Sequence, residues 1–231
     1  MNFIPHLAYD SVVFGFSGDK LKILIMEYHN TGLFALPGGF IRMTENLDDA
    51  VKRGLFERTG LKDIYLEQFY TFGSLERHQP QVMQTIITAN GLPRTGHSWL
   101  LDRYVTVAYY ALINYKLVVP RPDEISDSCT WYNLDALPTL ILDHQHIVDK
   151  ALHALRGNLD SHLVGLNLLP PVFTMNDLQK VYEVILGEKL HRGAFQRKML
   201  SLGILERQAK KYSGGAHKAP YVYTFISANR H

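Results

Sequence analysis

The residues between 36 and 61 combine a glycine-containing loop with charged side chains at helical spacing. The loop reads Leu-Pro-Gly-Gly at 36–39, and the charged residues that follow include Glu45, Arg53, Glu57 and Arg58. Positions 54, 57 and 58 would share one face of a helix, because residues three and four apart in a helix are neighbours. Carboxylates on such a face could bind Mg²⁺, which prefers oxygen ligands and bridges to phosphate groups.

The same stretch resembles a Nudix box, the motif of a family that hydrolyses nucleoside diphosphate compounds. Two glutamates of the family's core are missing here, since Gly54 replaces the first and Arg58 replaces the last. The resemblance implies a Nudix fold, and in family members the core glutamates hold Mg²⁺. The positions that match the family pattern are Gly39, Glu45, Arg53, Leu55, Glu57, Gly60 and Leu61.

The two replacements change the charge of the predicted metal-binding face. Three negative charges become one negative and one positive, and the arginine cannot lose its proton. We therefore expect the fold without its metal site, no metal, no cofactor, and catalysis that is absent or vestigial. The alternative is an active Nudix hydrolase that uses Glu57 and Glu45 with a ligand from elsewhere, such as Glu76.

The segments around the box predict an α/β/α sandwich with a mixed sheet. Runs of β-branched and aromatic residues predict strands at 9–16, 21–28, 64–72, 101–115 and 129–134. The box predicts a helix over 47–59, which Asn46 would cap and Gly60 would end. A second helix is expected at 144–159. With the C-terminal domain described below, the fold class is α+β.

A long segment before residue 101 is the main departure from the family. Comparable loops are shorter in family members and often contribute to the ligand pocket. Residues 81–92 fit either a strand or a small helix. The weak candidates for effector contacts are Glu76, Arg77 and Trp99.

The composition, with 46% hydrophobic and 20% charged residues, is typical of globular proteins. One cysteine, Cys129, excludes an internal disulfide, fits a reducing compartment and is expected to be a buried thiol. The start of the chain lacks a signal-peptide pattern, and apolar runs are too short to span a bilayer. We expect a cytoplasmic protein without membrane contact.

The net charge of +2 is unevenly distributed. Residues 172–231 carry ten Lys and Arg against four Asp and Glu, a charge of +6, whereas residues 1–171 carry −4. This asymmetry predicts a polyanionic partner for the C-terminal part alone. The expected domains are 1–160 and 172–231, joined by a linker at 161–171 that ends in two prolines.

The C-terminal domain predicts a winged helix-turn-helix. Thr174 can cap a first helix with Asp177 as its capping-box partner, and a second helix at 192–202 would bury Phe195, Met199 and Leu202. Strands at 204–207 and 220–226 would flank a glycine-tipped, lysine-rich wing. Arginine and glutamine of the second helix would contact bases, and lysines would contact phosphates. The predicted DNA-binding residues are Arg192, Gln196, Arg197, Lys198, Lys210, Lys211 and Lys218.

A Nudix domain followed by a winged helix resembles the Nudix-related transcriptional regulators of bacteria. This resemblance implies a homodimer whose Nudix domain binds a small-molecule effector and whose winged helix binds operator DNA. Family effectors are ADP-ribose-type metabolites or sugars such as arabinose, and a neutral sugar needs no metal. We therefore favour a sugar, with an ADP-ribose-type metabolite next. A protein-binding adaptor is a third hypothesis, which the basic C-terminal domain disfavours.

Overall fold

The computed structural model describes residues 2–16, 18–62, 64–92, 98–160, 168–210 and 220–226. Two compact units divide the chain, and the main division falls between Leu155 and Arg156. The predicted domain bounds of 1–160 and 172–231 stay a prediction, because most of the expected linker lies outside the described residues. In the described part of the chain, no helix is long and apolar enough to cross a membrane.

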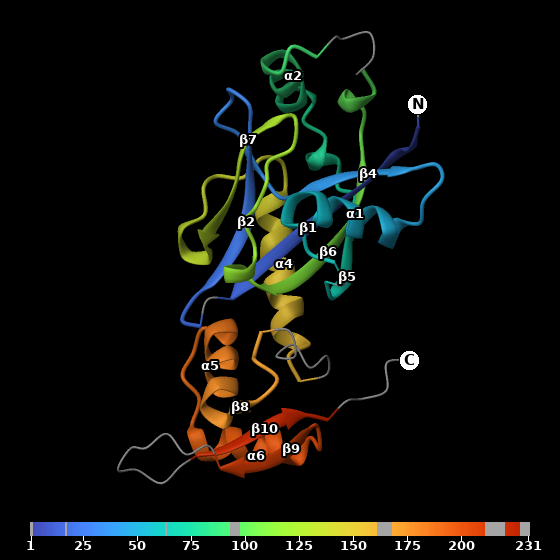
Figure 1. Ribbon diagram of the computed structural model, residues 1–231. Helices are drawn as coiled ribbons and strands as arrows, with labels where there is room; N and C mark the ends of the chain where they lie inside the picture. The colour runs from blue at the N-terminus through green and yellow to red at the C-terminus, as the bar shows by residue number, and fades with distance from the viewer. Residues whose placement is uncertain are drawn as a thin grey trace. The chain divides into compact units, whose positions relative to one another are not determined.

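A mixed sheet of seven strands, counted over the described residues, organises the first unit (Figure 1). Its central strands run in the order β3-β2-β1-β6-β5, while β4 pairs with β1 and β7 pairs with β2. β1 and β6 are parallel, and the other named pairs are antiparallel. The strands are β1 (Phe3–Phe16), β2 (Leu21–Tyr28), β3 (Phe34–Ala35), β4 (Gly38–Arg42), β5 (Leu66–Phe72), β6 (Val105–Asn114) and β7 (Ser126–Asn133).

Helices cover both faces of this sheet because successive strand residues point to opposite sides. Val13 and Leu24 belong to one buried cluster with Val51 and Leu55 of α1 (Leu47–Thr59). The opposite face carries α4 (His144–Gly157), where the ring of His146 packs against Phe72. The expected sandwich is therefore present, although β1 starts at Phe3 rather than at residue 9.

Two local predictions near the box can be compared with the structure. Gly60 ends α1 in the left-handed conformation, with φ of 69°, as expected. Asn46 precedes the helix, but its side-chain oxygen accepts no capping hydrogen bond from the backbone, and its amide donates to the Asp49 carboxylate. The undecided segment at 81–92 is a helix, α2 (Pro80–Ala89), which begins at a proline whose missing N–H costs the first turn nothing.

In its described residues, the second unit contains the helices α5 and α6 and a small antiparallel sheet (Figure 1). The predicted capping box is present: Thr174 Oγ1 accepts from the Asp177 N–H at 3.2 Å, and the Asp177 carboxylate accepts from the Thr174 N–H at 2.9 Å. The ring centroids of Tyr182 and Phe195 lie 5.1 Å apart and join the helices. The elements are β8 (Phe173–Thr174), α5 (Met175–Leu186), α6 (Arg192–Ser201), β9 (Leu205–Lys210) and β10 (Tyr221–Phe225).

The second helix of this unit is shorter than predicted. Phe195 and Met199 are buried, but Leu202, which follows the last residue of α6 with helical backbone angles, is 38% exposed. β9 and β10 pair antiparallel in the order β8-β10-β9. The predicted wing between these strands falls on residues 211–219, which lie outside the described residues.

Candidate effector and DNA sites

Arg53 binds both remaining glutamates of the box. Its Nε and Nη2 donate to the two carboxylate oxygens of Glu45 at 3.0 and 2.7 Å, and its Nη1 lies 3.5 Å from the Glu57 carboxylate. The hydrogen bonds from Arg53 lower the pKa of Glu45 to about 2. Both remaining glutamates of the box therefore already have a cationic partner.

Tyr9 fills the space beside Gly54, where the family has its first core glutamate. A Cβ built on Gly54 would lie 2.0 Å from the Tyr9 hydroxyl oxygen, and one on Gly39 would lie 2.7 Å from it. Tyr9 is buried, and burial raises the pKa of its phenol. Position 54 cannot carry any side chain while Tyr9 stays in place.

Arg58 is buried at the position of the last core glutamate. Its Nη1 donates to the Gly54 carbonyl at 3.1 Å, and its Nη2 donates to the Gly38 carbonyl at 3.1 Å and to Asp123 Oδ2 at 2.8 Å. A fixed cation at this point does not fit a site for a dication. Among the described residues, no group of three or more His, Cys, Asp and Glu side chains could hold a metal ion.

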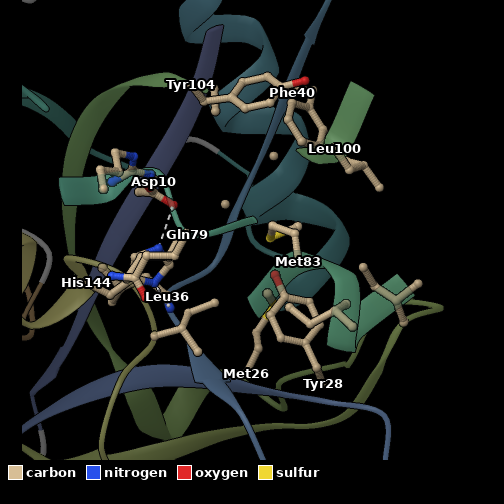
Figure 2. Close-up of a pocket in the computed structure, with 18 of the residues that line it drawn as sticks. Asp10, Met26, Tyr28, Leu36, Phe40, Gln79, Met83, Leu100, Tyr104 and His144 are labelled. Carbon is tan, nitrogen blue, oxygen red and sulfur yellow. Dashed lines mark hydrogen bonds and ion pairs between the residues drawn. The ribbon is translucent and has the colours of Figure 1, made fainter. Parts of the chain in front are cut away.

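A cavity of about 310 Å³ opens beside the box, within the range typical of small-molecule sites. Gly38, Gly39 and Arg58 form the wall that it shares with the box. Figure 2 shows Asp10 and His144 on one side, and Phe40, Leu100 and Tyr104 on another. Met83, from α2, also lines the cavity, so the segment before residue 101 supplies part of its apolar wall.

The polar side of the cavity is a buried charge network. Arg77 Nη2 lies 2.7 Å from Asp10 Oδ2, and the same guanidinium also binds Asp143. Burial acts to raise the pKa of Asp10, but the neighbouring His144 and Arg77 lower it overall. Because arginine is always charged, we regard Arg77 as the lasting counterion. The network keeps an ionised carboxylate on the cavity wall.

His144 completes this side as a neutral imidazole. Its Nδ1 accepts the Leu36 N–H at 3.0 Å, which leaves the proton of a neutral ring on Nε2, 3.7 Å from Asp10 Oδ1. Burial lowers the pKa of His144 more than Asp10 raises it. Leu142, which also lines the cavity, has φ of 52°, a rare conformation for a leucine and one that is often found at functional sites.

An aromatic cluster forms the opposite wall. The rings of Phe40 and Tyr104 lie 5.4 Å apart and both line the cavity, while Trp99 packs behind Phe40 at 4.7 Å. The Tyr104 hydroxyl donates to the Trp99 carbonyl at 2.9 Å, and burial raises the pKa of Tyr104 to about 12. This wall offers a neutral aromatic surface to a ligand.

The three predicted effector residues have different positions. Arg77 lines the cavity, Trp99 supports its aromatic wall, and the exposed Glu76 does not line it. Sequence reasoning missed Asp10 and Asp123. Asp10 could have been noticed as an acidic residue within the apolar strand β1. Its partner Arg77 is 67 residues away in the sequence, so the pair itself could not be inferred.

The predicted DNA-binding residues of α6 lie on different sides of the helix. Arg192 and Arg197 are exposed, and Gln196 is half-buried. Arg192 and Gln196 share one flank, because they are four residues apart. Lys198 lies on the other flank, where its Nζ is 2.7 Å from Asp160 Oδ2. Lys210 ends β9, and Lys211 and Lys218 lie outside the described residues.

The fold and sites define a two-domain protein, a Nudix domain with an altered box followed by a winged helix. Residues 5–155 match the family described as NUDIX domain, and residues 165–225 match the NrtR DNA-binding winged helix domain. The chain belongs to the NrtR type of Nudix-domain transcriptional regulators. The predicted family and fold class are thus confirmed.

Two relatives illustrate this assignment. An Acinetobacter baylyi protein described as ADPR responsive transcriptional repressor NtrR is 31% identical over 222 residues, which cover 93% of this chain and 80% of that protein. The crystal structure of Shewanella oneidensis NrtR has a TM-score of 0.72 and 28% identity, covering 96% of this chain and 94% of that one.

The Shewanella protein has also been solved with ligands. Its complex with a 27mer DNA has a TM-score of 0.70 and 27% identity, covering 95% of this chain and 93% of that one. Its Nudix domain complexed with ADP ribose has a TM-score of 0.50 and 28% identity, covering 66% of this chain and 89% of that one.

Proposed function

We propose that this protein is an ADP-ribose-responsive transcriptional repressor. Its Nudix unit binds ADP-ribose without hydrolysing it, and its winged-helix unit binds operator DNA. One observation carries this proposal: the cavity beside the Nudix box is present, while Arg53 pairs with the remaining glutamates and Arg58 replaces a metal ligand. The ligand cavity is therefore present beside a box whose metal-binding residues are altered.

The relatives favour ADP-ribose over a sugar. The Acinetobacter protein is named for its response to ADPR, and the Nudix domain of Shewanella NrtR was crystallised with ADP ribose. A sugar such as arabinose has no support among these relatives. Our preference for it rested on the assumption that a diphosphate requires a bound metal, and the Arg58 guanidinium on the cavity wall weakens that assumption.

The two sides of the cavity suit the two ends of ADP-ribose. Phe40 and Tyr104 offer an aromatic wall against which an adenine ring can pack. The ionised Asp10 carboxylate can accept hydrogen bonds from ribose hydroxyls. The diphosphate between these ends would then lie near the box.

Hydrolysis is not expected because the box cannot assemble a metal site. Gly54 has no space for a carboxylate beside Tyr9, and Arg58 would repel a dication. An active hydrolase is the alternative function. It would have to rely on Glu57, which is exposed and paired with Arg53, and on Glu45.

The winged-helix unit supplies the contact with DNA. Arg197 and Arg192 are the exposed arginines of α6, and such side chains read guanine in the major groove. A homodimer, which the family resemblance implies, would require a near-palindromic operator. Such a regulator acts where chromosomal DNA lies, which in a bacterium is the cytoplasm. ADP-ribose would release DNA by favouring a dimer geometry in which the two winged helices are mis-spaced.

Calorimetric titration tests the effector assignment. The protein is titrated with ADP-ribose, arabinose and related pentoses, and the ADP-ribose is analysed afterwards by chromatography. We expect saturable binding of ADP-ribose, no binding of sugars at the same concentrations, and intact ADP-ribose in the presence of Mg²⁺. Tighter binding of a sugar would contradict the proposal, as would turnover that Glu57→Gln abolishes.

The operator is obtained by an independent experiment. Genomic fragments are mixed with the protein, the retained fragments are sequenced, and their common motif is identified. We expect an inverted repeat with half-sites about one or more helical turns apart. Retention without any common motif would argue against a sequence-specific repressor.

A further inference from the structure

Arg58 occupies a place that the Nudix box normally gives to a metal ligand, and its guanidinium lines the effector cavity. We propose that Arg58 binds the diphosphate of the effector directly, in place of Mg²⁺. In the absence of the effector, the Asp123 carboxylate pairs with the Arg58 guanidinium. This inference rests on the proposed ADP-ribose function. It adds that the positive charge of Arg58 recognises the diphosphate, which replaces Asp123 as the partner of Arg58.

The anchoring of Arg58 does not depend on Asp123. Two backbone carbonyls, those of Gly54 and Gly38, accept hydrogen bonds at 3.1 Å from Nη1 and Nη2, and Nε donates to the sulfur of Met26 at 3.0 Å. With only 9% of its side chain exposed, the guanidinium is fixed by β2, β4 and α1. It therefore stays at the cavity wall whichever anion it binds.

Asp123 is the exchangeable partner. Its Oδ2 accepts from Arg58 at 2.8 Å, and its side chain is 30% exposed. Its other oxygen, Oδ1, accepts from the Ser126 hydroxyl at 2.6 Å and from the Ile125 N–H at 3.3 Å. If a phosphate oxygen replaces Oδ2, the carboxylate keeps two donors and can turn toward solvent, so the exchange leaves no buried charge unpaired.

Arginine suits this role chemically. Its guanidinium is permanently charged and donates in a planar fork that matches phosphate oxygens. Arg53 of the box does not compete for the ligand, because it is engaged by Glu45 and Glu57. Arg77 also lines the cavity, but its guanidinium is held by Asp10 and Asp143. Arg58, whose acidic partner Asp123 is partly exposed, is therefore the cation available to a diphosphate that enters the cavity.

The consequence is recognition that needs no divalent metal. A catalytic Nudix site binds its diphosphate through Mg²⁺ held by glutamates, whereas this site would carry the positive charge on the protein itself. Chelators should therefore leave binding unchanged, and the charge on Arg58 should determine the affinity for the diphosphate.

Calorimetry with the full-length protein and ADP-ribose tests this proposal. The wild type should bind with the same Kd in the presence of EDTA and of Mg²⁺. Arg58→Gln should weaken binding on the order of 10- to 100-fold, because a charge-assisted hydrogen bond is lost. Asp123→Asn, which removes the competing charge, should tighten binding by up to about fivefold. Lys52→Gln, on the exposed side of the same helix, is the matched control and should change nothing.

These outcomes distinguish a failure of this inference from a failure of the proposed function. Wild-type binding that disappears in EDTA would overturn the role of Arg58 and leave ADP-ribose as the effector. Weaker binding by Asp123→Asn would also overturn it, because Asp123 would then support the ligand instead of competing with it. This test is independent of whether Arg58→Gln folds. No wild-type binding in either condition would overturn the proposed function and the inference together.

Discussion

The Tyr9 hydroxyl occupies the space that a side chain on Gly54 would need. A Cβ at position 54 would lie 2.0 Å from the phenol oxygen, far inside van der Waals contact. Tyr9 comes from β1 and Gly54 from α1, so one aromatic residue and one glycine fit together across the helix–sheet interface. The glycine is therefore a packing requirement of this Nudix domain as well as a lost ligand.

We predict that Gly54→Ala destabilises the protein by about 1–2 kcal/mol. Alanine favours a helix over glycine by up to about 1 kcal/mol, but overpacking at a buried site costs about 1–3 kcal/mol. Chemical denaturation measures the difference. In the Tyr9→Phe background, which lacks the hydroxyl, Gly54→Ala should cost less. A stabilised Gly54→Ala variant would show that Tyr9 does not constrain this position.

Arg77 should be essential for stability. Arg77→Met leaves the buried Asp10 carboxylate without its counterion, and breaking a buried ion pair in this way costs about 3–5 kcal/mol. Urea unfolding is the measurement, with Arg121→Gln as an exposed control expected within about 0.5 kcal/mol of wild type. Adding Asp10→Asn to Arg77→Met should recover part of the loss. Equal stability of Arg77→Met and wild type would refute the network.

The Glu45–Arg53 pair gives a pH-dependent contribution to stability. The pKa of Glu45 falls from 4.5 to about 2 through its hydrogen bonds with Arg53, so the folded state favours the ionised carboxylate. This contribution is complete above pH 4.5 and is lost as the pH falls toward 2. The Tm difference between wild type and Glu45→Gln should shrink over that interval. A difference that does not vary with pH would contradict the assignment.

The winged-helix unit makes three separable predictions for DNA binding. Arg197→Ala should cost about 1–3 kcal/mol and relax specificity at one base pair. Lys211→Ala should weaken all sequences equally and reduce the salt slope by about one. Lys198→Ala should have less effect than either, because Lys198 pairs with Asp160. Fluorescence anisotropy at several salt concentrations measures all three. A uniform loss shared by Arg197→Ala and Lys211→Ala would refute the division between base and phosphate contacts.

The sequence predicted the fold because its signals are local. The charged spacing in residues 45–61, Gly60 after α1, and Thr174 with Asp177 at the start of α5 each depend on neighbours in the chain. Hydrophobic periodicity then placed most of the helices and strands. The burial of Leu202 was wrongly predicted, because the apolar spacing continues to this residue at the end of α6 although its side chain is 38% exposed.

The effector cavity could not be predicted in the same way. Asp10 meets Arg77, and Arg58 meets Asp123, across 67 and 65 residues of sequence, and such pairs have no local pattern. The replacement of a glutamate by Arg58 was visible in the sequence and indicated a lost metal site. The sequence did not show that Arg58 lines the cavity. For this reason we favoured a neutral sugar.

Release of operator DNA by ADP-ribose tests the central proposal most directly. The labelled operator is bound by the protein in the presence of EDTA, and its anisotropy is followed as ADP-ribose or arabinose is added. We predict that ADP-ribose lowers the anisotropy to that of free DNA while remaining intact, and that arabinose has no effect. Operator that stays bound at saturating ADP-ribose, or that is released by arabinose alone, would contradict the account.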